Sequence, residues 1–274
     1  MLEFEIVARG LYYPDQLVVD YNPIQRMPVT AEIQAYMDEL WQRKLKQAQE
    51  QDHRLFDAPL FRFIAATSHI NDALHLVLGD TSYKEYVTTR TTDFTQKHVR
   101  QDMGNPLAVC SVVETRDNYI LLDKRQGVDV YVGRYHVIGG FFERNLDMNT
   151  HTQPDPFAAI LREIREETGI QAADIEEQCG LGIVYDLQTP HYEMCFLTRL
   201  NISLDEVLHA RTPEEDEIKQ LHSLQVTAES LQEFIVTHHG NISATGEPNL
   251  LLYGGEKFGR EWFDEVMKDI LEQG

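Results

Sequence analysis

A chain of 274 residues that is 42% hydrophobic is long enough to bury one large core or two ordinary ones. Its formal net charge of −21, with no basic stripe to offset it, excludes long-range attraction to a nucleic-acid backbone. The three cysteines, Cys110, Cys179 and Cys195, lack the close pairs of a zinc site or a disulfide framework. No signal-peptide pattern opens the chain, and no apolar run reaches membrane-spanning length. We expect a soluble, cytoplasmic protein without a nucleic-acid or membrane partner.

The first hundred residues predict a mixture of strands and helices. In chain order we expect a strand over 2–8, a helix over 31–51, a hairpin of strands over 61–67 and 73–78, and a helix beginning near Tyr83. Apolar residues recur at helical spacing over 31–51, and Thr30 is placed to cap this helix. Thr81 or Ser82 is placed to cap the next one.

Turn-forming residues around 101–106 predict a domain boundary. We expect a smaller α+β domain over 1–104, with a role in substrate recognition, and a larger α/β domain over 105–274. The larger domain is expected to contain strands over 107–113, 119–123, 193–200 and 221–226, and helices over 156–168, 228–238 and 260–271. The first two of these strands are expected to pair as a hairpin.

The helix predicted over 156–168 carries the clearest chemical signal. Asp155 and Pro156 are typical of a helix start, and Gly169 is typical of a helix end. On a helical wheel its glutamates fall within about 100° of one another, apart from the apolar arc; they are Glu163, Glu166 and Glu167. Clustered carboxylates repel one another, and hard oxygen ligands suit Mg²⁺ or Mn²⁺. The alternative is an ordinary solvated acidic face.

A longer pattern decides between these two interpretations. The run from Arg162 to Ile170, Arg-Glu-Ile-Arg-Glu-Glu-Thr-Gly-Ile, resembles the core of the Nudix box, and every specified position is filled. Upstream, Gly139-Gly140-Phe141-Phe142-Glu143 resembles the glycines and glutamate that open the box. The resemblance implies a Nudix α/β/α sandwich with a mixed sheet, preceded here by the smaller α+β domain.

The resemblance also implies chemistry and roles. Nudix enzymes hydrolyse phosphoric anhydrides with Mg²⁺ or Mn²⁺, which neutralises the phosphates and activates water. The implied metal ligands are Glu163, Glu166 and Glu167. The implied catalytic residues are Arg162, Glu166 and Glu167, with the arginine orienting a glutamate. Gly139 and Gly140 are expected to let the backbone approach the phosphates.

The chain departs from the usual box in its spacing. The arginine expected at position 154 stands at 162, which leaves eight extra residues in the polar stretch 145–153. A loop insertion of this kind costs little closure entropy. Where the family usually carries a further glutamate, this chain has Leu146. Either Asp147 or Asp155 replaces that glutamate, or the ligand is missing.

The motif does not identify the general base. The candidates are a glutamate of the box, Glu193, or a carboxylate of the acidic run Glu214-Glu215-Asp216-Glu217. We assign no role to His191, His238 or His239, because histidines without ligand spacing are usually structural.

Segments outside the box indicate the substrate. Residues 40–63, 79–86, 181–183 and 249–253 resemble the Nudix group that hydrolyses UDP-glucose to UMP and glucose 1-phosphate. This implies a nucleoside diphosphate-sugar substrate, preferably UDP-glucose or UDP-galactose. Phe56, Tyr83 or Tyr86 is then placed to offer an aromatic face to the base.

Two alternatives stay open. One is a pyrophosphatase of ADP-ribose or a dinucleotide, and the other is a non-catalytic, nucleotide-binding regulatory module with the Nudix fold. The sequence indicates a small-molecule nucleotide partner and no particular oligomeric state.

Overall fold

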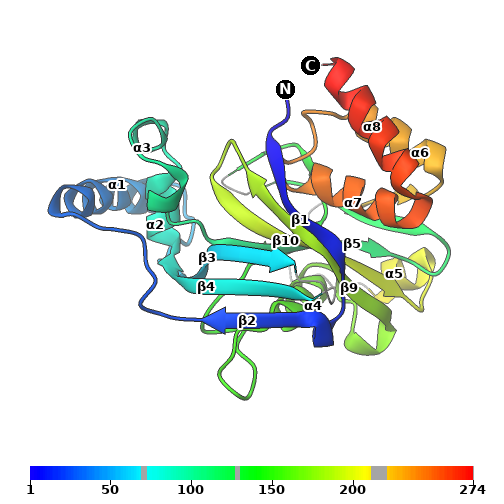
Figure 1. Cartoon of the computed structure of the whole chain (residues 1–274), viewed down its shortest axis with the longest axis horizontal. Coiled ribbons are helices and arrows are strands. Elements are labelled where there is room, and N and C mark those ends of the chain that lie inside the picture. Colours follow the sequence, from blue (N-terminus) through cyan, green and yellow to red (C-terminus); the bar gives the residue numbers. More distant parts are fainter. Residues whose placement is uncertain (69–72, 127–129, 211–220, 274) are drawn as a thin grey trace.

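Two β-sheets organise the chain (Figure 1). The computed structural model describes residues 1–68, 73–126, 130–210 and 221–273. The strands are β1 (Phe4–Tyr12), β2 (Leu17–Tyr21), β3 (Pro59–Ser68), β4 (Leu74–Ser82), β5 (Leu107–Glu114), β6 (Tyr119–Lys124), β7 (Tyr135–His136), β8 (Ile138–Phe141), β9 (Ile175–Asp186), β10 (His191–Leu200) and β11 (Leu221–Gln225). In the described residues the larger sheet has the order β1-β9-β10-β5-β6-β11, with β8 paired to β5 and β7 to β6, and the smaller has the order β2-β4-β3.

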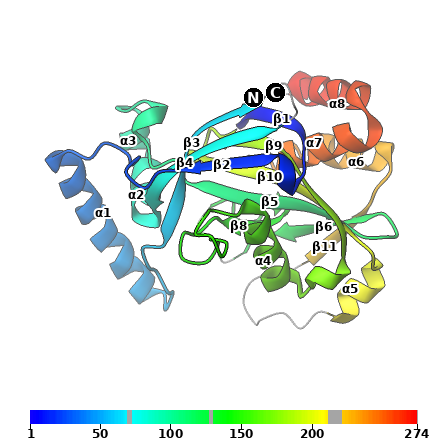
Figure 2. The ribbon, with the colours of Figure 1, turned by 60° about the horizontal axis from the view of Figure 1, so that its bottom comes forward.

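Helices cover both faces of the larger sheet (Figures 1 and 2). They are α1 (Ala31–Glu50), α2 (Tyr83–Thr89), α3 (Thr92–Thr95), α4 (Pro156–Thr168), α5 (Leu204–Ala210), α6 (Ala228–Thr237), α7 (Gly246–Phe258) and α8 (Arg260–Gln273). Along β5, Val109 and Val113 pack with α4 and the smaller sheet, whereas Cys110 and Val112 pack with α6, α7 and α8. Alternating side chains of one buried strand therefore serve two cores.

The expected α/β/α sandwich on a mixed sheet is confirmed. Strand β10 runs parallel to β5 and antiparallel to β9. Helix α4 begins and ends at the predicted residues. The Asp155 side chain caps its start by accepting a hydrogen bond from the Ala158 N–H, and Gly169 ends it with a left-handed φ of 77°. Thr30 caps α1 and Ser82 caps α2, as their positions in the sequence indicated.

The expected boundary at residue 104 does not divide the two sheets. Strand β1 belongs to the larger sheet, where it pairs antiparallel with β9 and buries Phe4 and Tyr12. Only β2, β3 and β4 form the smaller sheet, and α1 stands out to one side of it (Figure 2). The N-terminal segment thus contributes to both sheets.

Helix α7 has no counterpart among the predicted elements. Its residues from Gly246 to Gly254 are all buried, so it has no polar face to give a helical period. Pro248 and three glycines also lower its intrinsic helix propensity. Gly254 is needed for packing, because a Cβ there would lie 2.0 Å from the Trp262 ring of α8.

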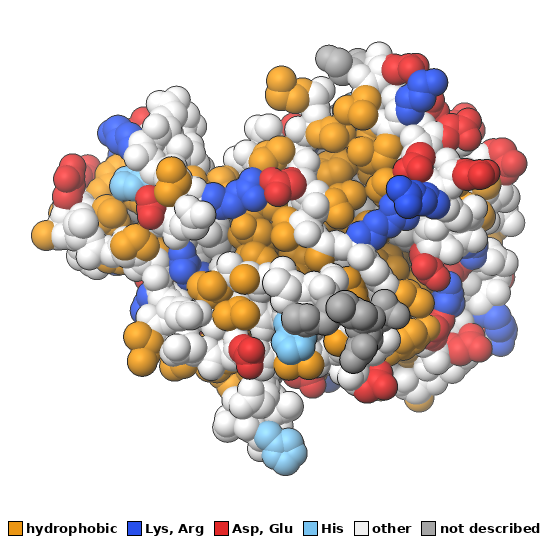
Figure 3. Space-filling model, viewed as in Figure 1, with side chains coloured by type: hydrophobic (Ala, Val, Ile, Leu, Met, Phe, Trp, Pro, Cys, Tyr) orange, Lys and Arg blue, Asp and Glu red, His pale blue; other side chains and the backbone are white. Residues whose placement is uncertain are grey.

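Acidic side chains gather over α8 on the face shown in Figure 3. Glu261, Asp264 and Glu265 are exposed there, while Trp262, Val266 and Ile270 point into the core. In the described part of the chain, no helix is both long enough and apolar enough to span a membrane.

The pairing of β1 with β9 depends on Gly182. Its φ is 152°, and a Cβ would lie 2.2 Å from the Ala8 carbonyl oxygen. We expect Gly182→Ala to lower the free energy of unfolding by about 1–3 kcal/mol, measured by urea denaturation. The control is Gly180→Ala, whose new methyl meets only the mobile end of Met194 at 2.9 Å. Equal stabilities of the two variants would contradict a close backbone contact at Gly182.

Candidate active site

The glutamates of α4 lie beside the glycine turn at β8. The apolar side of α4 buries Phe157, Ile160 and Ile164 in the core. On the β8 side, the Gly139 N–H donates a hydrogen bond of 3.2 Å to Glu167 Oε2. A Cβ on Gly140 would lie 2.5 Å from Glu163 Oε1. The absence of a side chain at Gly140 is therefore what lets the backbone touch the Glu163 carboxylate.

Arg162 ties the parts of this site together. Its Nε and Nη2 donate to the two oxygens of Asp147 at 2.8 and 2.9 Å, in a bidentate pair. Its Nη1 donates to Glu163 Oε1 at 2.8 Å and to Glu166 Oε2 at 3.0 Å. Burial alone would lower the pKa of Arg162, but the bonds to Asp147 and the charge of Glu163 raise it. One guanidinium thus holds three carboxylates.

The two aspartates proposed to replace the missing glutamate have different partners. Asp147 is 2% exposed and accepts hydrogen bonds from Arg162 and from the Glu143 N–H, whereas Asp155 caps α4. Leu146 is 55% exposed. Asp147 is therefore the acidic partner of the arginine.

The extra residues form a loop whose ends meet. Met148 and Pro154 are paired by a β-bridge, and the Asp155 N–H donates to the Asp147 carbonyl at 2.9 Å. The loop leaves the site at Asp147 and returns at the cap of α4. Its length consequently does not separate the glycine turn from the glutamates.

Glu167 lies close to two other carboxylates, those of Glu163 and Asp123. The pKa of Glu167 is raised well above its ordinary value, first by burial and then by the nearby charges of Glu163 and Asp123. Burial also raises the pKa of Glu143. Such a set of oxygen donors suits a hard divalent cation. In the positions that the described side chains adopt, however, no three His, Cys, Asp or Glu residues form a ready metal-binding group.

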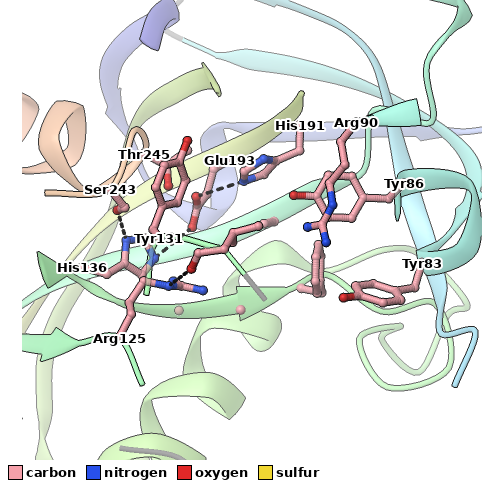
Figure 4. A pocket seen from close by; sticks show the side chains of 15 residues that line it. Tyr83, Tyr86, Arg90, Arg125, Tyr131, His136, His191, Glu193, Ser243 and Thr245 are labelled. Atoms are coloured by element: carbon pink, nitrogen blue, oxygen red, sulfur yellow. Dashed lines mark hydrogen bonds and ion pairs between the residues drawn. The ribbon is translucent and has the colours of Figure 1, made fainter. Parts of the chain in front are cut away.

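A cavity of about 290 Å³ lies over the glycine turn (Figure 4). Its floor includes Gly139, Gly140 and Phe141 of β8, and Ala108 of β5. The remaining lining residues come from α2, β10 and the segments before β7 and α7: Tyr83, Tyr86, Arg90, Arg125, Val130, Tyr131, His136, His191, Glu193, Ser243 and Thr245. Two segments that are distant in sequence, α2 and the start of α7, thus close opposite ends of one cavity.

One end of the cavity is aromatic. The ring centroids of Tyr83 and Tyr86 lie 5.7 and 5.6 Å from that of Phe141, both in edge-to-face geometry. The Arg90 guanidinium lies 4.7 Å from the Tyr86 ring centroid. Tyr83 and Tyr86 therefore both line the cavity. Phe56 is 61% exposed and does not line it.

The other end is polar; the sequence offered Glu193 as a candidate base, gave no role to His191 and did not identify His136. Glu193 is 3% exposed, and each of its oxygens lies 3.7 Å from a histidine Nε2, that of His136 or that of His191. Burial opposes ionisation of Glu193, but these histidines hold its pKa well below the ordinary value. Contacts with Tyr86, Glu193 and Asp186 raise the pKa of His191 to about 10, against the effect of burial.

A signal for this end was present in the sequence. His191 and Glu193 are two residues apart on β10 and so share one face of the strand. Two ionisable residues on one face of a buried strand are uncommon unless they are paired. The other candidates for the base, Glu214, Glu215, Asp216 and Glu217, lie outside the described residues.

The sequence matches no protein-family model and no curated protein. Among solved structures, the chain is similar to a bifunctional NMN adenylyltransferase/ADP ribose pyrophosphatase from Francisella tularensis, with 15% identity, a TM-score of 0.39, and coverage of 57% of this chain and 42% of that one. It is similar to a pyrophosphohydrolase of Bacillus subtilis, with 15% identity, a TM-score of 0.35, and coverage of 61% and 82%. It is also similar to the NUDIX domain of NrtR from Shewanella oneidensis complexed with ADP ribose, with 15% identity, a TM-score of 0.31, and coverage of 48% and 80%. The chain spans less than half the length of the first of these proteins, and likenesses of this size assign no activity to it.

The ion pair between Arg162 and Asp147 can be tested by mutation. Asp147→Asn removes the charge that faces Arg162 in a largely buried pair, so we expect it to lower the free energy of unfolding by about 3 kcal/mol. Asp155→Asn is the matched control, because asparagine caps a helix about as well as aspartate. Urea denaturation of both variants measures the difference. Similar losses in the two variants would mean that Asp147 is not the partner on which the site depends.

Proposed function

We propose that this chain is a divalent-metal-dependent pyrophosphohydrolase of the Nudix type. One observation carries the proposal: the Gly139-Gly140 backbone lies directly against Glu163 and Glu167, on the floor of a cavity. The two halves of the sequence motif thus meet, although eight extra residues separate them. An ordinary solvated acidic face would have no reason to pack against a glycine turn at the floor of a cavity.

The residues of this site suit hydrolysis of a phosphoric anhydride. Glu163, Glu166 and Glu167 would hold Mg²⁺ or Mn²⁺, which supplies charge neutralisation at the phosphates and activation of water. Arg162, itself anchored by Asp147, orients Glu163 and Glu166. The backbone at Gly139 and Gly140 lines the cavity beside these carboxylates, where the phosphates would lie. The water oxygen bonds to one phosphorus, the bridging P–O bond breaks, and two monophosphates are released.

For the substrate we propose a nucleoside diphosphate-sugar, with UDP-glucose or UDP-galactose preferred. The cavity supports this choice because it is lined by the aromatic rings of Tyr83 and Tyr86, by the glycine turn and by the carboxylate of Glu193, and Figure 4 shows the tyrosines and Glu193 around it. A base stacks on aromatic rings, and a sugar requires hydrogen-bonding partners. ADP-ribose or a dinucleotide is the alternative substrate, since it also places groups on both sides of a diphosphate.

A binding module without turnover is the second candidate function. Arg162 Nη1 is within 3.0 Å of both Glu163 and Glu166, and it neutralises the carboxylates that a metal would use. In such a module the guanidinium takes the place of the cation. The site would then bind nucleotides without cleaving them.

Turnover of a substrate panel distinguishes these functions. The protein is incubated with Mg²⁺ and UDP-sugars, ADP-ribose, NADH, diadenosine polyphosphates or nucleoside triphosphates, and monophosphate release is measured. We expect release of UMP and sugar 1-phosphate from UDP-glucose and UDP-galactose. Turnover of ADP-ribose alone would refute the preferred substrate. Binding of nucleotides without any turnover would refute the enzyme in favour of the binding module.

A substitution at Glu167 tests the metal site. We expect Glu167→Gln to lower kcat at least about 100-fold, because the loss of a metal ligand removes several kcal/mol of transition-state stabilisation. Stability should change little, since the substitution keeps the shape of the side chain and removes a charge that is already strained. Glu176→Gln, at an exposed position of β9, is the matched control and should retain full activity. Normal turnover by Glu167→Gln would place the metal elsewhere.

A further inference from the structure

Glu193 is a buried carboxylate that faces the cavity without a hydrogen-bond donor at normal distance. Its side chain lines the cavity at the polar end (Figure 4). The distances of 3.7 Å to His136 and His191 are those of ion pairs and are too long for hydrogen bonds. In the described part of the chain no other side chain donates to it. A buried carboxylate in this position has unused capacity to accept hydrogen bonds.

The two histidines are themselves held by groups behind them. His191 Nδ1 is 2.6 Å from the Thr189 carbonyl oxygen, so Nδ1 carries a proton and donates it there. His136 Nδ1 is 2.6 Å from Ser243 Oγ, which also accepts a hydrogen bond from the Gly246 N–H. On its other side the His136 ring turns Nε2 toward the Glu193 carboxylate, at 3.7 Å. The carboxylate is thus kept ionised, and its orientation is fixed.

The strand register sets the distance between Glu193 and the glycine turn. Glu193 on β10 is paired with Ala108 on β5, and Ala108 is paired with Phe141 on β8. Two strand spacings amount to about 10 Å. The side chain between them is only a methyl group, so the floor of the cavity stays open from Glu193 to the glycines. A sugar attached to a diphosphate over the glycine turn can bridge this distance.

We propose that Glu193 binds the vicinal diol at C2 and C3 of a sugar ring in the substrate. This inference rests on the proposed function for the position of the diphosphate. Two adjacent hydroxyls can donate one hydrogen bond to each carboxylate oxygen, and hydrogen bonds to an ionised acceptor are the stronger kind. The diol belongs either to the ribose or to the hexose, since both present the same chemistry.

A role as general base explains Glu193 less well. A base is most effective when its pKa lies near the working pH. The two histidines instead hold the pKa of Glu193 well below its ordinary value, which makes it a poor proton acceptor and a persistent hydrogen-bond acceptor. The strand register also places Glu193 two strand spacings, about 10 Å, from β8, the strand whose glycines touch the α4 glutamates.

Titration calorimetry with matched deoxy ligands tests the proposal. The full chain is titrated in Ca²⁺ with UDP-glucose and UDP-2-deoxyglucose, and separately with UDP and 2′-deoxy-UDP, while monophosphate release is checked in the same samples. We expect one deoxy ligand to bind about tenfold or more weakly than its parent, because a hydrogen bond to a charged group is lost. Weaker binding of UDP-2-deoxyglucose than of UDP-glucose would show that Glu193 binds the hexose diol. Weaker binding of 2′-deoxy-UDP than of UDP would show that it binds the ribose diol.

The variant Glu193→Gln completes the test. It should bind the parent ligand about tenfold more weakly and bind the deoxy ligand with unchanged affinity, so that discrimination disappears. Glu247→Gln is the matched control, because Glu247 is also 3% exposed and paired with a histidine but does not line the cavity. It should keep the discrimination of the unmodified chain.

Two outcomes overturn the diol site. One is equal binding of parent and deoxy ligands in both pairs by the unmodified chain, a result that does not depend on the folding of any variant. The other is discrimination that survives in Glu193→Gln. Failure of the proposed function gives a different result, namely discrimination in binding without turnover of any compound in Mg²⁺.

Discussion

The bidentate ion pair between Arg162 and Asp147 is the contact on which the site depends. It joins α4 to the end of the segment that follows β8, and the same guanidinium reaches Glu163 and Glu166. A planar fork of donors fixes direction as well as distance, which a lysine would not do. Because Asp147 is buried and also accepts from the Glu143 N–H, its own position is determined by the backbone. The backbone thus positions Asp147, Asp147 positions Arg162, and Arg162 in turn positions the carboxylates of Glu163 and Glu166.

The sandwich allows this contact by burying β5 on both faces. One face of β5 packs toward α4, and the other face is covered by α7. The glycine turn lies on β8, which is paired with β5. The cavity opens where α2 and the start of α7 approach the same strands from different directions. Residues as far apart in the sequence as Tyr83 and Thr245 therefore line one volume.

The sequence predicted local structure well, because it depends on near neighbours. Caps, a proline and a glycine defined α4 to the residue, and helical spacing placed three glutamates on one face. It failed where burial removes periodicity, as in α7, and where a partner is distant, as in the pairing of β1 with β9. At the polar end of the cavity the sequence named only Glu193, as a candidate base, for the same reason. His136, His191 and Glu193 acquire their roles from contacts across strands, and only His191 and Glu193 are near each other in sequence.

The position of β1 has a consequence for how the chain folds. Phe4 at the start of the chain pairs with Asp186, so one edge of the larger sheet is completed by residues that are separated by most of the molecule. Contacts of such long sequence separation form late, because the loop between them must first be closed. During synthesis β1 emerges long before its partner and must wait as an unpaired strand. In the described residues, the ladders of β2, β3 and β4 join these strands to one another and not to β1. The two sheets therefore cannot fold as successive independent units. The larger sheet, and with it the site, is complete only when β1 pairs with β9.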